Sequence, residues 1–397
     1  MDYFVKIGNN LSKVSSRNID YAKEIDKDNN NILDYNEIKD FLIRNDDLKI
    51  VNTRQGEKII YEKRIIREFS DFLTEKPMET QNFIRDYERI IESMKELQAK
   101  YPDRVFLQTI GKTFEGRDIV VIKVSKKNDC RQDKKSLLIT GLHHAREWAT
   151  GEAALNLVEK LLANYDTDEN VKNLLDNIDI YVIPVVNPDG YEYSLKQSRW
   201  WRKNRKVFND SVGVDLNRNY YTEKNPELYR TKGDRPDSIF DDYGASDRPY
   251  SDTYRGPYGA SEEEIKAIQD FVNSNNINTV IDLHSYGNMI LFPWGITDKP
   301  TIWENIYKEV GNEMNQAAGK KYWVSQAIYL YPTTGSSEDY HQEEGRFNYT
   351  IEVGKGFFPS SQKELNQIKE EVLNMTIVFM KNLMNGKIPV SKFLVSS

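Results

Sequence analysis

The stretch "SLLITGLHHAREW", residues 136 to 148, joins an apolar run to two consecutive histidines, an arginine and a glutamate. The apolar run predicts a buried strand, and pockets of open α/β sheets lie outside the carboxyl ends of their strands. His144 and Glu147 are spaced i, i+3, so on a turn or at a helix start they can face one metal ion. His143 and Glu147, spaced i, i+4, can do the same, and spacing alone leaves the register open.

A third candidate ligand follows another apolar run. The chain contains four histidines, so a histidine at a second strand end is informative. His284 comes directly after "TVIDL", although an isolated buried histidine is more often a hydrogen-bonded core residue than a ligand. Convergence of the two strand ends would give two imidazoles and a carboxylate, with a fourth position left for water. That set is typical of a catalytic zinc site.

Strand-like and helical patterns alternate from about residue 81 onward. Further apolar runs are "DIVVIKV", "IYVIPVV" and "NYTIEV", and helical periodicity marks "GEAALNLVEKLLANY", "SEEEIKAIQDFV" and "IWENIYKEVGNEMNQAAG". This alternation predicts an α/β domain with helices on both faces of a largely buried sheet. A chain of 397 residues is long enough for one such domain with a smaller region beside it.

Composition narrows the classes of partner and compartment. A formal net charge of −7 argues against a general role at nucleic acid or at a membrane surface, because neither polyanion attracts an acidic protein. The single cysteine, Cys130, cannot form an internal disulfide, so folding does not depend on an oxidising compartment. We see neither a signal peptide at the start nor an apolar run of spanning length, and the compartment stays open.

The first 50 residues are polar, and "DKDNNNILDYNE", residues 26 to 37, resembles the calcium loop of an EF-hand. Acids and amides alternate there at the spacing such a loop requires, with a carbonyl ligand at the seventh position. The six expected ligand residues are Asp26, Asp28, Asn30, Ile32, Asp34 and Glu37. Asn31 replaces the usual glycine at position six, where asparagine tolerates a positive φ. A solvated Asn/Asp-rich turn is the alternative, but the six matches favour a calcium-binding, EF-hand-like region with a helix on each side.

The catalytic region resembles a known family through six motifs in order. "HAREW", "RWWRKNR", "VDLNRN", "HSY", "YPTTGSSEDY" and "TIE" follow one another as in zinc carboxypeptidases of the carboxypeptidase A, B and bacterial T type. The resemblance spans roughly residues 81 to 385. It implies a mixed, mostly parallel eight-stranded sheet with helices on both faces. We therefore divide the chain into an EF-hand-like region (1–50), a helical linker (51–80) and a catalytic domain (81–390).

The resemblance also implies a role for each motif residue. It selects His144, Glu147 and His284 as zinc ligands and leaves His143 as a neighbour. Glu352 matches the general base, and Arg202 the arginine that stabilises the oxyanion. Read without the family, a glutamate at a buried strand end is costly unless paired or functional, whereas Arg202 could be solvated surface. Residues matching the grip on the substrate's C-terminal carboxylate and its neighbourhood are Arg146, Asn217, Arg218 and Tyr331.

The resemblance thus predicts a zinc-dependent exopeptidase that cleaves the C-terminal peptide bond of peptides or proteins. Glu338 falls where the family places the floor of the side-chain pocket, which predicts a preference for C-terminal Arg or Lys; a glutamate that turns aside would give broad specificity. One alternative, a deacylase of small amino acid derivatives, would not need the full carboxylate grip. A second, a catalytically dead calcium-dependent binding module, would not need the complete set of ligands and base. The resembled family is often secreted.

Overall fold

The computed structural model describes residues 2–7, 10–15, 19–44, 66, 69–70, 73, 82–129, 131, 134–208, 211–229 and 244–390. The predicted helical linker, 51–80, therefore lies almost entirely outside the described residues. None of the described helices is both long and apolar enough to span a membrane.

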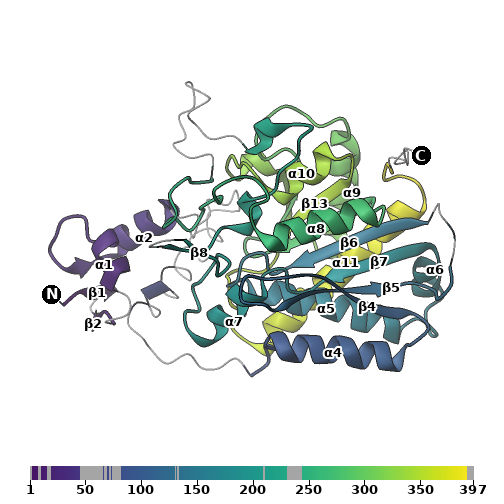
Figure 1. Cartoon of the computed structure of the whole chain (residues 1–397), viewed down its shortest axis with the longest axis horizontal. Coiled ribbons are helices and arrows are strands. Elements are labelled where there is room, and N and C mark those ends of the chain that lie inside the picture. The colour runs from purple at the N-terminus through teal and green to yellow at the C-terminus, as the bar shows by residue number, and fades with distance from the viewer. Residues whose placement is uncertain are drawn as a thin grey trace.

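An eight-stranded mixed sheet forms the centre of the large domain (Figure 1), as predicted. Four of its seven strand pairings are parallel; of the antiparallel ones, two are outermost at one edge and the third is second from the other edge. From one edge to the other the strands are β12 (Trp323–Gln326), β11 (Met289–Phe292), β13 (Phe347–Glu352), β10 (Thr279–His284), β6 (Lys135–Gly141), β7 (Ile178–Ile183), β5 (Asp118–Val124) and β4 (Val105–Lys112).

Helices cover both faces of the sheet because its central strands are apolar on both sides. Leu137 and Ile139 of β6 join one core, whereas Leu138 between them joins the other. The first core packs against α4 (Tyr87–Lys100), α5 (Trp148–Ala163), α6 (Glu169–Asn177), α9 (Glu304–Ala317) and α11 (Gln362–Met384). The second packs against α8 (Glu263–Ser274) and α10 (Ser337–Glu343), which lie above the sheet in Figure 1.

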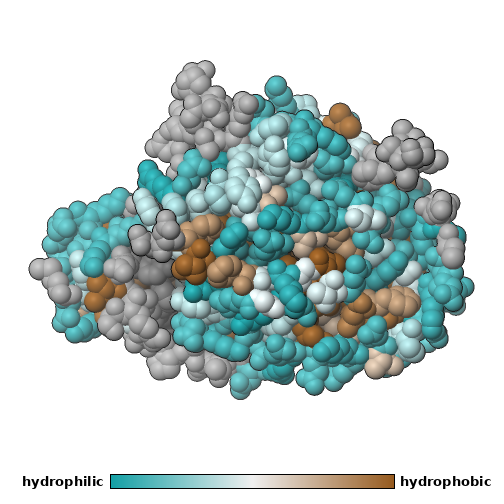
Figure 2. All heavy atoms as spheres, viewed as in Figure 1, coloured by the Kyte–Doolittle hydropathy of each residue, from teal (hydrophilic) through white to brown (hydrophobic). Residues whose placement is uncertain are grey.

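Shorter elements complete the large domain. They are α7 (Pro188–Lys196), the hairpin of β8 (Val207–Phe208) and β9 (Ser211–Val212), and the 3₁₀ turns η2 (Leu216–Arg218), η3 (Pro226–Tyr229) and η5 (Ala327–Tyr329). The face shown in Figure 2 is mainly hydrophilic, with apolar patches scattered over it. The apolar side chains of the large domain are thus gathered mainly in its buried cores.

The N-terminal region contains the predicted helix–loop–helix and an additional small sheet. Helices α1 (Ile19–Ile25) and α2 (Tyr35–Arg44) flank the candidate calcium loop. The sequence did not predict β1 (Phe4–Ile7) and β2 (Asn10–Lys13), which form a hairpin. Strand β3 (Ile32–Leu33), inside the loop, pairs in parallel with β1. The hairpin therefore supplies the backbone partner that the short loop strand needs.

Aromatic rings join this N-terminal region to the large domain. Phe41 of α2 stacks on Phe69 with ring centroids 5.6 Å apart, and Phe69 meets the edge of Trp200 at 5.0 Å. Trp200 is 1% exposed and also packs against Phe357 and Phe358. The two regions consequently share one apolar core.

Candidate metal centre

Three parallel neighbours, β13, β10 and β6, end at the same edge of the sheet and carry the candidate site. Strand β10 ends at His284, which lies directly opposite Glu352, the last residue of β13. Strand β6 ends at Gly141, just before the two histidines. Strands β6 and β10, whose ends precede or carry the candidate histidines, are direct neighbours in the sheet, and β13 lies on the other side of β10.

A turn after β6 sends the two adjacent histidines in different directions. Leu142 takes a positive φ of 58°, a backbone conformation that is costly for a leucine and tightens the turn. The His144 Nδ1 atom lies 2.8 Å from Glu147 Oε1. His143 instead directs Nδ1 to Asp282, at 3.0 Å, and Nε2 to the hydroxyl of Tyr220, at 2.8 Å. The turn therefore distinguishes the two residues that spacing left equivalent.

The side chains of His144, Glu147 and His284 direct their donor atoms at one another. The Nδ1 atom of His284 lies 3.1 Å from His144 Nδ1 and 3.0 Å from Glu147 Oε2. All three side chains are buried. Two borderline nitrogen donors and one carboxylate this close together fit a divalent zinc ion.

Electrostatics favour ligand forms of two of these groups. Burial and the cation of Arg202 lower the pKa of His144, so that its imidazole is neutral. Burial opposes charge on Glu147, but the two histidines outweigh it and hold the pKa of that carboxyl well below its usual range. A neutral imidazole and an ionised carboxylate are the protonation states in which these groups bind metal.

Asp215 links a candidate ligand to the candidate oxyanion arginine, and no role was predicted for it. Its Oδ1 lies 3.1 Å from His144 Nε2, while Oδ2 accepts hydrogen bonds from Arg202 Nε and Nη2 at 3.0 and 2.7 Å. Asp215 also caps η2 by accepting from the backbone N–H of Asn217. One buried carboxylate thus fixes three neighbouring groups.

The candidate carboxylate-binding residues lie on η2 and around it. Asn217 Oδ1 accepts from the backbone N–H of Ser337, and its Nδ2 lies 3.3 Å from His284 Nε2. Arg218 donates to the backbone carbonyls of Asn217 and Gly244, and its guanidinium lies 5.9 Å from the ring centre of Tyr331. The motif "DLNRN" therefore reaches the same edge of the sheet as His284.

Two further predicted residues lie in separate surroundings. Arg146 is fully buried, donates to the carbonyl of Trp200 at 3.1 Å and faces the Phe357 ring at 4.4 Å. Glu338, on α10, is 6% exposed. A Cβ built at Gly295 would lie 3.0 Å from its Oε1, so the carboxylate faces the backbone of that glycine.

Comparisons with known proteins agree with this geometry. The family model described as zinc carboxypeptidase matches residues 90–375. Carboxypeptidase B of Rattus norvegicus is 34% identical over 72% of this chain and 68% of its own length, and carboxypeptidase A1 of the same animal is 35% identical over 69% and 64%. The chain thus spans about two thirds of the length of these relatives, and less than that of carboxypeptidase A1.

A solved structure shows the same fold at moderate identity. Bovine thrombin-activatable fibrinolysis inhibitor, in complex with tick carboxypeptidase inhibitor, superposes with a TM-score of 0.66 and 29% sequence identity. The superposition covers 76% of this chain and 98% of the other.

Proposed function

Because the chain belongs to the zinc carboxypeptidase family, we propose that it hydrolyses the C-terminal peptide bond of peptides or proteins, using zinc held by His144, Glu147 and His284. The observation that carries the proposal is the convergence of these three buried donor groups at one sheet edge, beside Glu352. Zinc bound there would polarise the scissile carbonyl and make a water molecule more acidic. Protein side chains carry out proton transfer, oxyanion stabilisation and substrate binding.

Glu352 acts in this proposal as the general base. It accepts a proton from the attacking water and later passes one to the departing amine, which a buried carboxylate near the metal can do. Arg202 donates to the carbonyl oxygen as negative charge develops on it. The hydrogen bonds from Arg202 to Asp215 hold its guanidinium in place before substrate arrives, so little reorganisation is needed.

Asn217, Arg218 and Tyr331 bind the free carboxylate of the substrate, with Arg146 as an additional cation. A guanidinium offers two parallel N–H groups to two carboxylate oxygens, which suits Arg218. Recognition of that carboxylate makes the enzyme an exopeptidase, because an internal peptide bond presents none.

Glu338 gives the pocket for the C-terminal side chain a preference for Arg or Lys. Its side chain is buried and faces the backbone of Gly295. The hydroxyl of Thr350 lies 3.5 Å from its Oε2, and within the described part of the chain no cationic side chain pairs with it. A partly desolvated carboxylate without a protein counter-ion would attract a cationic substrate side chain.

The N-terminal loop binds calcium through Asp26, Asp28, Asn30, Ile32, Asp34 and Glu37. Three of its carboxylates lie close enough together to hold one cation. Asp26 is 6% exposed, and its Oδ1 has no hydrogen-bond partner in the described structure. Asn31 adopts a φ of 62°, the conformation that the sharp turn at position six requires. A buried, unpartnered carboxylate oxygen is costly unless a cation completes its surroundings.

Metal analysis combined with a peptide assay tests the proposed activity. We expect one zinc per chain at the catalytic site and release of single C-terminal amino acids from a mixed peptide panel. The matched control is each peptide with its C-terminal carboxylate amidated, which should not be cleaved. Cleavage of internal bonds, or equal cleavage of the amidated peptides, would contradict the proposal.

A further inference from the structure

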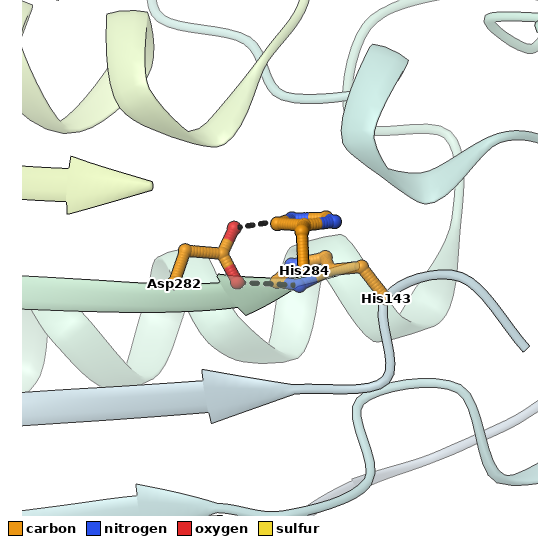
Figure 3. Close-up of side chains that lie close together, drawn as sticks. All are labelled: His143, Asp282 and His284. Atoms are coloured by element: carbon orange, nitrogen blue, oxygen red, sulfur yellow. Dashed lines mark hydrogen bonds and ion pairs between the residues drawn. The ribbon is translucent and has the colours of Figure 1, made fainter. Parts of the chain in front are cut away.

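A second group of buried polar side chains adjoins the zinc site and shares one of its residues. His143, Asp282 and His284 lie close enough together to hold a metal ion of their own (Figure 3). All three side chains are buried. This group is either a second metal site or a hydrogen-bonded support for the first.

Asp282 contacts both histidine rings, which stack on each other with their centroids 5.5 Å apart (Figure 3). Its Oδ2 lies 3.1 Å from His284 Nε2, and its Oδ1 lies 3.0 Å from His143 Nδ1. The hydroxyl of Thr140, directly opposite on β6, donates to Oδ1 at 2.7 Å. Asp282 points to the same side of the sheet as His284 because the two residues are separated by two positions on β10.

The positions of the protons follow from the metal site. If Nδ1 of His284 held the proposed zinc ion, its Nε2 would carry the ring proton and donate to Asp282. The amide Nδ2 of Asn217, 3.3 Å away, can only donate, so it cannot be the acceptor for that proton. The Nδ1 atom of His143 lies 3.0 Å from Asp282 Oδ1 without forming a well-aligned hydrogen bond, and its Nε2 lies 2.8 Å from the Tyr220 hydroxyl. Nε2 of His284 therefore has Asp282 as its acceptor.

We propose that Asp282 is a positioning residue for His284, and that His143 and Tyr220 in turn hold Asp282. The carboxylate fixes the orientation and tautomer of the imidazole and makes its Nδ1 a stronger donor to the metal. This inference rests on the zinc site proposed above and adds a second buried carboxylate to it. Asp215 supports His144 from one side, and Asp282 supports His284 from the other.

The hydrogen bonds argue against a second metal ion in the group. A cation there would have to displace the hydroxyl of Thr140 from Asp282 Oδ1. It would also compete for Nε2 of His284, whose other nitrogen faces the zinc site. Both oxygens of Asp282 already have partners, the Thr140 hydroxyl at Oδ1 and His284 Nε2 at Oδ2, whereas Asp26 Oδ1 of the candidate calcium loop has none in the described structure.

The proposal is tested by the zinc affinity of the Asp282→Asn variant. This affinity is measured on the full chain by competition with a chelator. Loss of the carboxylate partner should raise the zinc Kd about 10- to 100-fold. Asp189→Asn is the matched control, because Asp189 is an equally buried carboxylate that bonds Thr113, Glu115 and Arg117, away from the metal ligands. The control should lower the melting temperature and leave the zinc Kd unchanged.

His143→Phe provides a second measurement that keeps the ring volume if Asp282→Asn fails to fold. It should weaken zinc binding in the same direction but by less. Zinc Kd values within twofold of the parent in these variants would overturn the inference, provided that His144→Ala loses zinc. Retention of zinc by His144→Ala would instead overturn the zinc site and this inference with it. Two zinc ions per parent chain, falling to one in Asp282→Asn, would also overturn it.

Discussion

The two candidate metal sites of this chain are built in different ways. The zinc site takes its side chains from the ends of strands that are distant in sequence, and every one of them is buried. The candidate calcium loop takes its six predicted ligands from one short segment, in which Asp28, Asn30 and Asp34 are exposed. The first site depends on the pairing of β6, β10 and β13; the second depends mainly on local backbone conformation.

The difference lies in what holds the ligands in place. At the candidate zinc site, carboxylates fix the imidazole rings: Asp215, from another segment, contacts His144, and Asp282, on the same strand as His284, contacts that ring. In the calcium loop, the ligand side chains accept bonds from nearby backbone N–H groups: Asn30 Oδ1 accepts from Ile32, and the two oxygens of Glu37 accept from Lys27 and Asp34. We therefore expect single substitutions at the zinc site to cause large losses of zinc binding. Single substitutions in the loop should lower the calcium affinity by smaller steps.

The largest effect is expected at the first histidine pair. His144→Ala should abolish zinc retention and activity because it removes a ligand, whereas His143→Ala should keep stoichiometric zinc with weaker affinity. Metal analysis after dialysis and turnover of one peptide check both variants. Reversed effects would show that His143, and not His144, is the zinc ligand. The role proposed for His143 in holding Asp282 would then be wrong.

Glu352→Gln should lower turnover by about 10²- to 10⁴-fold, because the amide cannot accept the proton from water. Zinc content and the substrate KM should stay near those of the parent, since neither requires the base. Steady-state kinetics with metal analysis separate the two. Turnover within a few-fold of the parent would exclude Glu352 as the base.

Glu338→Gln should reduce the preference for C-terminal Arg and Lys by about thirtyfold, which corresponds to roughly 2 kcal/mol of lost attraction. The measurement is kcat/KM for otherwise identical peptides ending in Arg, Lys, Phe, Leu and Glu. A parent enzyme that prefers Phe or Leu, with no change in the variant, would eliminate the charged floor.

The smallest effect is expected at the calcium loop. Millimolar calcium should raise the melting temperature by a few degrees, because binding to the folded state alone stabilises it. Glu37→Gln should remove the effect, while Asp40→Asn, outside the loop with the same change of charge, should keep it. Calorimetry that detects neither heat nor a shift in melting temperature would leave the solvated-turn interpretation.

The predictable parts of the fold were those with strong local patterns. The central strands β5, β6, β7, β10 and β13 coincide with continuous apolar runs, which buried strands require. Strands β11 and β12 have four residues each, and β4 is an edge strand with several exposed positions, so no comparable pattern marks them. The hairpin β1–β2 was missed for the same reason.

In the site, the spacing around His144 and Glu147 indicated a metal ligand pair, but it could not select between two adjacent histidines. That choice depends on the positive φ of Leu142, which the sequence does not indicate because leucine rarely adopts it. Asp282 had a usable signal: an acid within the aliphatic run "TVIDL" is costly unless it has a partner. Its two histidine partners become apparent only when β6 and β10 are paired.

The edge-to-face contact between Phe69 and Trp200 bears on where the N-terminal side of the large domain can be shortened. The family match begins at residue 90, yet Phe69, which lies before that boundary, packs against the buried Trp200 ring. A recombinant fragment that started at the family boundary would expose this ring next to Arg146, whose guanidinium donates to the Trp200 carbonyl. Soluble, active protein is therefore best sought with an expression boundary upstream of Phe69.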